Sequence, residues 1–252
     1  FRLDPGFAPA VSNGKAVWLE YGRDNYAGVT WSDVPKSDGR RLLIGWMSNW
    51  DYATVVPTTA WRSAATLARS LTLVKTTAGY RLRSQPVREL EALRVKSHDL
   101  AATEISAPID LTGTIGFPPT LSEMELTFEL NDGASGTFGV ELSNSKNERY
   151  RIGYNAASGQ YFSDRTKAGD ASFSGKFATG AHLAPRPSKD KTVRLHLFFD
   201  AASAELFADN GETVMTEIFF PSEDFDRVKL FAEGGKARLI KGRVHQLKSI
   251  WR

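Results

Sequence analysis

The sequence predicts an all-β protein of antiparallel sheets, in which the C-terminal part forms a sandwich of two packed sheets. Short apolar or alternating runs of strand length recur along the chain, as in residues 41–47 (RLLIGWM) and 124–130 (MELTFEL). Turn residues separate these runs, for example at Asn131-Asp132-Gly133. Only residues 87–93 (VRELEAL), which follow Pro86, have helical character.

Composition excludes several classes of function. The 252 residues are 41% hydrophobic and 24% charged, which is ordinary for one large β domain or two smaller ones. The net charge of +3 is scattered, without a basic run, so we expect no nucleic-acid partner. The chain has no Cys and its four His are far apart, so we expect no metal site and no cofactor.

Membrane association and localisation are less well defined by the sequence. No run of 18 apolar residues exists, so we expect no membrane span. The absence of Cys does not fix the compartment, and a secreted or periplasmic location stays open. The chain begins with Phe1 rather than Met, which suggests a fragment or a processed chain.

The N-terminal region predicts one antiparallel sheet. Strands are expected at residues 16–21, 25–31 and 41–47, with turns short enough to make them neighbours. Two further strands, 68–74 and 80–84, are joined by a short turn.

From about residue 99 onward the pattern is strand, turn, strand, with one apolar face on each strand. Such strands favour two packed sheets over a ligand-filled barrel. Phe198-Phe199, Phe207 and Phe219-Phe220 are expected in the core. The expected strands are 124–130, 137–142, 149–154, 193–199, 204–208, 214–220, 228–232 and 237–246.

The distribution of tryptophan indicates the domain boundary. Five of the six Trp lie in the first 61 residues, and the sixth is Trp251. We place the boundary at residue 75, which gives domains of 1–75 and 76–252. No linker rich in Pro, Ser or Gly separates them, so the two domains are expected to pack together.

Residues 41–62 suggest a sugar site. They contain Trp46, Trp50 and Trp61, and strand 41–47 ends in the polar and aromatic turn Ser48-Asn49-Trp50-Asp51. An aromatic ring can cover the apolar face of a sugar while an amide or carboxylate binds its hydroxyls. Each Trp taken alone is more typical of a core or interface anchor.

Four residues are predicted to form a substrate-binding edge. Asp24 opens strand 25–31, and Asn49 and Trp50 follow strand 41–47. Since the start of one antiparallel strand lies beside the end of its partner, Asp24, Trp46, Asn49 and Trp50 should share one edge. The alternative is that Asp24 caps a turn and the tryptophans fill a gap between sheets.

Two other charged motifs are expected to be structural. Arg62 should pair with an acidic residue at the interface with the sandwich. Asp164-Arg165 should form an ion pair at a hairpin end, with a surface sugar contact as the alternative.

Six ordered stretches together resemble a known family. They are residues 20–27 (EYGRDNYA), 41–50 (RLLIGWMSNW), 61–62 with 68–73 (WR and ARSLTL), 85–90 (QPVREL), 164–165 (DR) and 205–216 (ELFADNGETVMT). They resemble the C-terminal part of glycoside hydrolase family 32, the β-fructosidases, which include invertases, levanases and exo-inulinases. One departure is Glu20, where the family has Asp.

This resemblance implies a fold and an activity. It implies the last blade of a five-bladed β-propeller in residues 1–75, followed by a two-sheet antiparallel β-sandwich. The activity would be retaining cleavage of β-fructofuranosyl bonds in fructan or sucrose. The family's nucleophile motif W-x-N-D-P-N-G and its E-C acid/base motif do not occur in the 252 residues. We therefore expect no catalytic residue in this chain, which alone should be inactive.

Two alternatives stay open, a non-catalytic carbohydrate-binding module and a purely structural sandwich. The strands of residues 1–75 have apolar residues on both faces, and a large uncovered apolar surface is rare on soluble monomers. We therefore expect this region to pack against the rest of the propeller as another chain, or against a second copy of this one.

Overall fold

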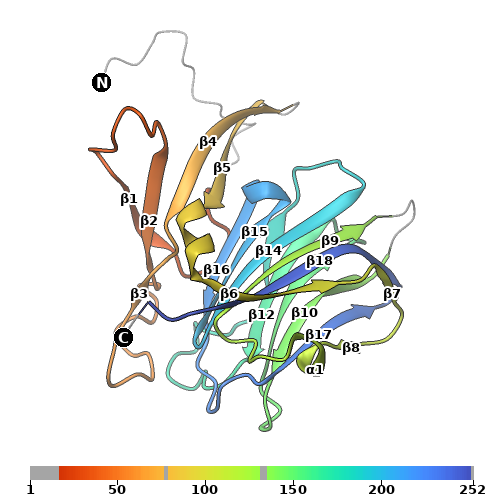
Figure 1. Cartoon of the computed structure of the whole chain (residues 1–252). Helices are drawn as coiled ribbons and strands as arrows, with labels where there is room; N and C mark the ends of the chain where they lie inside the picture. The colour runs from red at the N-terminus through yellow and green to blue at the C-terminus, as the bar shows by residue number, and fades with distance from the viewer. Residues whose placement is uncertain (1–16, 77–78, 131–134, 251–252) are drawn as a thin grey trace.

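The computed structural model describes residues 17–76, 79–130 and 135–250 (Figure 1). In these residues an N-terminal antiparallel sheet stands beside a two-sheet sandwich, which confirms the all-β prediction. The N-terminal sheet has the order β1-β2-β4-β5, with β3 paired to β2. Its strands are β1 (Tyr26–Thr30), β2 (Arg41–Met47), β3 (Ala64–Ala65), β4 (Arg69–Thr76) and β5 (Gly79–Pro86).

The N-terminal sheet continues past the predicted boundary at residue 75. Strand β4 extends to Thr76, and β5 pairs with it along its whole length, from Thr76 opposite Gly79 to Arg69 opposite Pro86. Strand pairing therefore ends this sheet at Pro86, where the 3-10 helix η1 (Arg88–Leu93) leads into the sandwich. This helix confirms the helical character predicted for residues 87–93.

The sandwich consists of a six-stranded and a seven-stranded sheet. The first has the order β13-β12-β11-β10-β17-β8, and the second has β16-β15-β14-β9-β18-β6, with β7 paired to β18. The six strands are β8 (Ile109–Asp110), β10 (Thr137–Ser143), β11 (Arg149–Asn155), β12 (Gln160–Lys167), β13 (His182–Pro185) and β17 (Arg227–Glu233). The seven are β6 (Arg94–Leu100), β7 (Thr103–Ile105), β9 (Ser122–Glu129), β14 (Thr192–Asp200), β15 (Ser203–Ala208), β16 (Thr213–Ile218) and β18 (Ala237–Leu247).

Two short helical turns were not predicted. They are α1 (Thr112–Ile115) and the 3-10 turn η2 (Asp209–Gly211). Both are single turns at strand ends, too short to leave a helical period in the sequence. Within the described residues, no helix has the length and hydrophobicity to cross a lipid bilayer.

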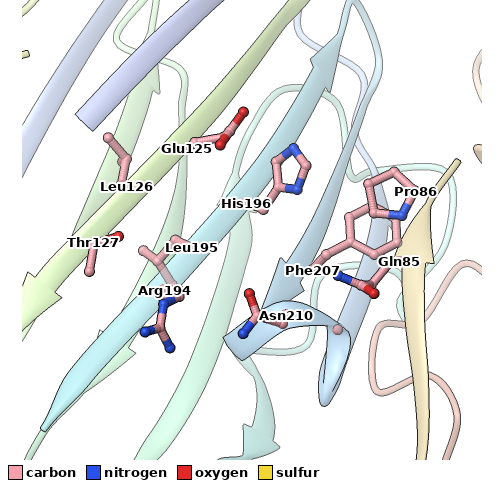
Figure 2. Close-up of a pocket in the computed structure, with 11 residues that line it drawn as sticks. Gln85, Pro86, Glu125, Leu126, Thr127, Arg194, Leu195, His196, Phe207 and Asn210 are labelled. Atoms are coloured by element: carbon pink, nitrogen blue, oxygen red, sulfur yellow. The ribbon is translucent and has the colours of Figure 1, made fainter. Parts of the chain in front are cut away.

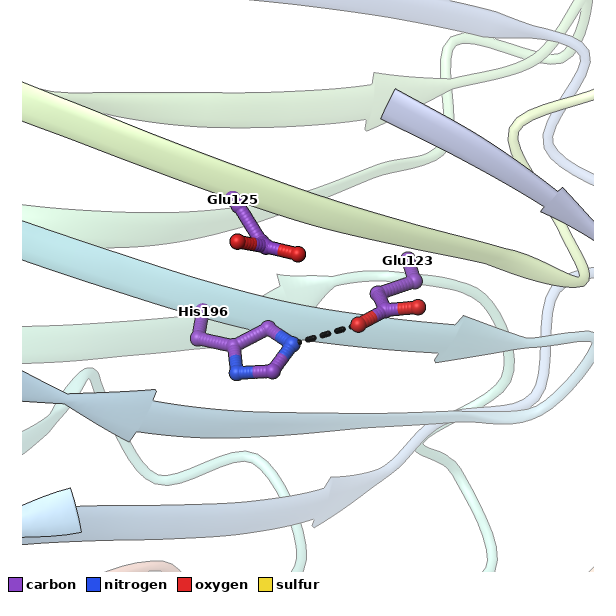
Figure 3. Close-up of side chains that lie close together, drawn as sticks. All are labelled: Glu123, Glu125 and His196. Carbon is purple, nitrogen blue, oxygen red and sulfur yellow. Dashed lines mark hydrogen bonds and ion pairs between the residues drawn. The ribbon is translucent and has the colours of Figure 1, made fainter. Parts of the chain in front are cut away.

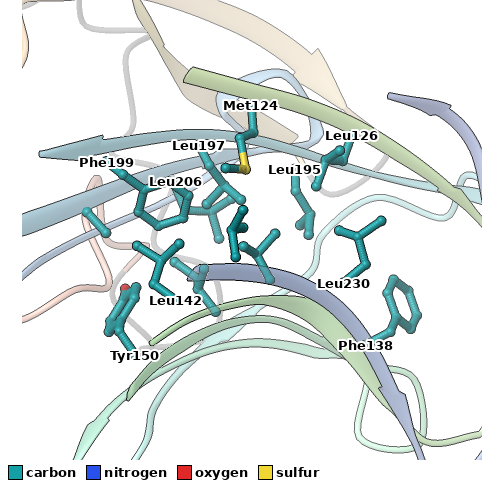
Figure 4. Close-up of a cluster of buried hydrophobic side chains, with 14 of the residues drawn as sticks. Met124, Leu126, Phe138, Leu142, Tyr150, Leu195, Leu197, Phe199, Leu206 and Leu230 are labelled. Atoms are coloured by element: carbon teal, nitrogen blue, oxygen red, sulfur yellow. The ribbon is translucent and has the colours of Figure 1, made fainter. Parts of the chain in front are cut away.

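The core lies between the two sheets of the sandwich (Figure 4). Alternate residues of β9 and β14, such as Leu126 and Leu197, point inward and are buried. The rings of Phe128 and Phe138 lie 4.8 Å apart across the core. Each such side chain contributes about 1.5–3 kcal/mol by burial, so this core dominates the stability of the chain.

The strand predicted at residues 16–21 does not form in its described part, residues 17–21. This segment instead leads onto the free edge of β16. The amide of Tyr21 donates to the carbonyl of Val214 at 2.9 Å, and that of Asp24 donates to Thr216 at 3.1 Å. The N-terminal region is thus joined to the sandwich by main-chain hydrogen bonds.

A glycine makes this close approach possible. A Cβ on Gly22 would lie 2.2 Å from the backbone nitrogen of Thr216, far inside van der Waals contact. Only glycine lets the two backbones come so close. The N-terminal sheet is therefore packed directly against the sandwich, as the absence of a linker predicted.

Candidate functional site

Three of the four predicted site residues lie together where β2 ends. The rings of Trp46 and Trp50 have centroids 5.0 Å apart, and Tyr26 of β1 meets Trp46 edge-on at 6.3 Å. Trp50 is 66% exposed and Tyr26 is 56% exposed. We call Trp46, Asn49 and Trp50 the wall, because they present ring faces and an amide along one edge of the sheet.

Asn49 holds the wall in place. Its side-chain nitrogen donates to the carbonyl of Arg23 at 2.8 Å, and its side-chain oxygen accepts from the amide of Asp51 at 2.9 Å. Its own carbonyl accepts from the amide of Tyr52 at 3.1 Å. Among the described contacts, one N–H of its amide and one lone pair of its side-chain oxygen remain for a ligand.

A hollow of about 580 Å³ lies beside the wall. Asn49 lines it together with residues 18–23, 25–28 and Leu43. The lining includes the exposed rings of Trp18 and Tyr26. Aromatic faces beside amide and guanidinium groups suit a polyol, because rings cover C–H surface while polar groups bind hydroxyls.

Asp24, the fourth predicted residue, is not on this edge. Its side chain is fully buried and points into the sandwich. One carboxylate oxygen accepts from the hydroxyl of Tyr52 at 2.5 Å, and the other from Arg165 at 2.5 Å and the amide of Ile218 at 3.0 Å. Strand pairing alone predicted that Asp24 lies at this edge. In the structure its carboxylate turns toward the buried Arg165, where a ligand cannot reach it.

Of the described carboxylates next to the wall, neither Asp24 nor Asp51 combines solvent access with a raised pKa. Burial raises the pKa of Asp24 to about 6, but solvent does not reach it. Asp51 is accessible, yet its ion pairs with Lys176 at 3.0 Å and Arg23 at 2.8 Å lower the pKa of its carboxyl. General acid catalysis near neutral pH needs both properties in one group.

Glu20 also serves the interface. Its carboxylate accepts from Arg69 at 2.8 Å and from the amide and hydroxyl of Thr216 at 2.8 and 2.9 Å. Arg69 is fully buried and continues to Glu205 at 2.6 Å. The longer side chain at position 20 thus reaches across to β16 of the sandwich.

The structure corrects both predictions for the charged motifs. Arg62 pairs with no acidic residue in the described part of the chain; it donates to the carbonyls of Thr54 and Thr58, within its own loop. Asp164 and Arg165 do not pair with each other, because neighbouring strand residues point to opposite faces. Asp164 accepts from Thr166 on the surface, while Arg165 is buried at the interface.

One group of side chains has the geometry of a metal site but not the electrostatics (Figure 3). Ligand atoms of Glu123, Glu125 and His196 lie within 4.8 Å of one another. Arg94, however, donates to both oxygens of Glu123 at 2.6 Å and to Glu125 at 3.2 Å. This guanidinium already balances the carboxylates and would repel a divalent cation, so the group does not fit a metal.

A second, smaller cavity of about 110 Å³ lies where β5 meets the outer face of the seven-stranded sheet (Figure 2). Its lining includes the side chains of Gln85, Thr127, Phe207 and Asn210. It is far smaller than the hollow beside the wall.

Comparisons with known proteins identify the family. Residues 4–86 match the model of the glycosyl hydrolases family 32 N-terminal domain, and residues 89–246 match that of the family 32 C terminal. The chain belongs to glycoside hydrolase family 32. The junction between the two matches coincides with the end of β5 at Pro86.

This family 32 chain is similar to levanases and exo-inulinases. It is 36% identical to a levanase of Bacillus subtilis over 94% of this chain and 35% of the relative. It is 34% identical to an extracellular exo-inulinase of Aspergillus niger over 95% of this chain and 44% of the relative. A crystal structure of exo-inulinase from Aspergillus awamori matches with a TM-score of 0.81 at 26% identity, covering 94% of this chain and 46% of that one. The chain thus spans less than half the length of these relatives.

Proposed function

We propose that the chain is the C-terminal portion of a retaining β-fructosidase that acts on fructan or sucrose. The N-terminal sheet would be the last blade of a five-bladed propeller, and the wall would bind the sugar. The observation that carries this proposal is the exposed Trp50 packed against the half-buried Trp46 beside Asn49, in a family whose named relatives include levanases and exo-inulinases.

The catalytic acids would come from outside these residues. Retaining hydrolysis uses two carboxyl groups about 5–5.5 Å apart, one as nucleophile and one as a proton donor with a raised pKa. Near the wall, Asp24 is closed to solvent and Asp51 is held ionised by two basic partners. The wall would therefore bind and orient the sugar while another part of the protein cleaves it.

A further polypeptide would cover the exposed side of the N-terminal sheet. Every residue of β1 is exposed, and Val29 and Trp31 expose 62% and 44% of their surface. Exposed apolar patches of this kind mark interaction surfaces. The partner would be the rest of the propeller or a second copy of this chain. Light scattering coupled to size-exclusion chromatography tests this, and a stable monomer of 27.8 kDa would argue against it.

Hydrolysis assays test the proposed activity. The chain would be incubated with sucrose, inulin and levan, alone and together with the N-terminal portion of a family 32 levanase. We expect fructose release only from the mixture. Release by the purified chain alone would contradict the proposal that the acids lie elsewhere.

The alternative function is a non-catalytic carbohydrate-binding module, and the cavity in Figure 2 favours it. The amide side chains of Gln85 and Asn210 line this cavity, and amides can bind sugar hydroxyls. Calorimetry with levan and inulin oligosaccharides separates the two functions. Binding that survives Trp50→Ala but is lost in Asn210→Ala would support the module.

A further inference from the structure

Arg165 joins the sandwich to the segment that carries the wall. It lies on β12, is 1% exposed and reaches out of the sandwich. One guanidinium nitrogen donates to Asp24 at 2.5 Å, and another donates to the hydroxyl of Tyr52 at 2.9 Å. The ring of Phe177 lies 3.9 Å from the guanidinium and closes it off from solvent. The two side chains that accept its hydrogen bonds belong to the N-terminal region. Within the sandwich, Arg165 also pairs with Glu217 at 3.2 Å and donates to the carbonyls of Phe177 and Ile218, both at 3.0 Å.

These two partners flank the wall on both sides. Tyr52 follows the wall and donates its hydroxyl to Asp24 at 2.5 Å, which closes a triangle with Arg165. Asp24 comes directly after Arg23, whose carbonyl accepts from the Asn49 amide at 2.8 Å. The amide of Tyr52 donates to the carbonyl of Asn49 at 3.1 Å. Asn49 is thus fixed from two sides by groups that Arg165 holds.

We propose that Arg165 is a positioning residue, through which the C-terminal sandwich sets the geometry of the wall. The effect of Arg165 on sugar binding rests on the proposed function, whereas its effect on the geometry of the wall does not depend on that function. A guanidinium with fixed donors is suited to this role, because it holds two acceptors at a defined distance from each other. The sandwich would then contribute to substrate affinity without touching the substrate.

The sandwich contains a matched control for this arrangement. Arg186 donates to Asp209 at 2.7 Å, and Tyr161 donates to the same carboxylate at 2.7 Å. Tyr52 and Tyr161 are both fully buried. The triad of Arg186, however, lies wholly within the sandwich. Tyr52→Phe and Tyr161→Phe therefore delete equivalent hydroxyls, one next to the wall and one far from it.

Hydrogen exchange measured by mass spectrometry tests the positioning role. Loss of a hydrogen bond to a charged group should raise local opening by roughly tenfold. We expect Tyr52→Phe to speed exchange in residues 49–56 by about that factor, and Tyr161→Phe to leave this segment unchanged. Arg165→Lys keeps the charge but loses the fork that reaches Tyr52, and should act like Tyr52→Phe.

Kinetics of the mixture with the N-terminal portion provide the second measurement. We expect Tyr52→Phe to raise KM for levan about tenfold with kcat within roughly twofold, since positioning acts on binding. Unchanged exchange in residues 49–56, or equal acceleration by Tyr161→Phe, would overturn the inference. If the wild-type mixture releases no fructose, the proposed function fails while the exchange measurement still decides the role of Arg165.

Discussion

Replacing Arg69 by methionine would remove the cation that holds the N-terminal sheet to the sandwich. Arg69 is fully buried and donates to Glu20 at 2.8 Å, to Glu205 at 2.6 Å and to Thr216 at 2.6 Å. Methionine keeps the apolar stem but leaves the buried Glu205 carboxylate without its cation. Breaking a buried ion pair from one side typically costs about 3–5 kcal/mol.

The expected loss is large for a chain of this size. A cost of about 3–5 kcal/mol corresponds to a fall of roughly 6–20 °C in Tm. Five of the six Trp lie in the first 61 residues, so Trp fluorescence follows the N-terminal sheet, whereas far-UV circular dichroism follows mainly the sandwich. The fluorescence transition should therefore shift more than the dichroism transition.

The pH dependence of the variant gives a further check. Burial already raises the pKa of Glu205, against the opposing charge of Arg69. Without Arg69 this pKa rises further, so protonation should reduce the cost of the substitution at acidic pH. Arg238→Met is the control, because its contact with Glu129 is 3.7 Å long and exposed. A loss below about 1 kcal/mol in Arg69→Met would refute the importance assigned to this pair.

Three further predictions concern pH and close packing. Burial raises the pKa of Asp24 from 3.8 to about 6, so the stability that its protonation contributes is present below pH 3.8 and lost as the pH rises through 6. Urea unfolding at a series of pH values should show this loss in the wild type, and Asp24→Asn should remove it. Despite burial, hydrogen bonds from Arg94 and His196 lower the pKa of Glu123 from 4.5 to about 2. The stability that its ionised carboxylate contributes is therefore present above pH 4.5 and lost toward pH 2, and Glu123→Gln should remove this loss of stability in acid. Gly22→Ala should cost about 1–3 kcal/mol in the same assay, because its Cβ would meet the backbone of β16, and an unchanged midpoint would contradict the close approach.

The strands could be predicted because their pattern is local. Strand β2 matches the expected residues 41–47, since an apolar run of this length bounded by turn residues has few other solutions. The sandwich strands follow from the same alternation. The strand prediction was wrong for residues 17–21, because this segment bonds to β16, almost 200 residues away in the chain, and not to its neighbour in sequence.

The interface could not be predicted, because its contacts join distant residues. The pair Asp24 and Arg165 is separated by 141 positions, and Arg69 and Glu205 by 136. In sequence, a lone arginine on a strand indicates a solvent-exposed face. The wall was predictable for a different reason: Trp46, Asn49 and Trp50 lie within five residues, so the strand and its turn bring them together.

The central claim is that the wall binds the sugar while another part of the protein cleaves it. The most direct test measures fructose release from levan by this chain mixed with the N-terminal portion of a family 32 levanase, and compares Trp50→Ala with Trp61→Ala. Both tryptophans are exposed, at 66% and 44%, but Trp61 packs near Phe220 of the sandwich and is not part of the wall. We predict no release by the chain alone, release by the mixture, a loss of roughly tenfold or more in kcat/KM for Trp50→Ala, and little change for Trp61→Ala. Fructose release by the chain alone, or equal effects of the two substitutions, would contradict the account.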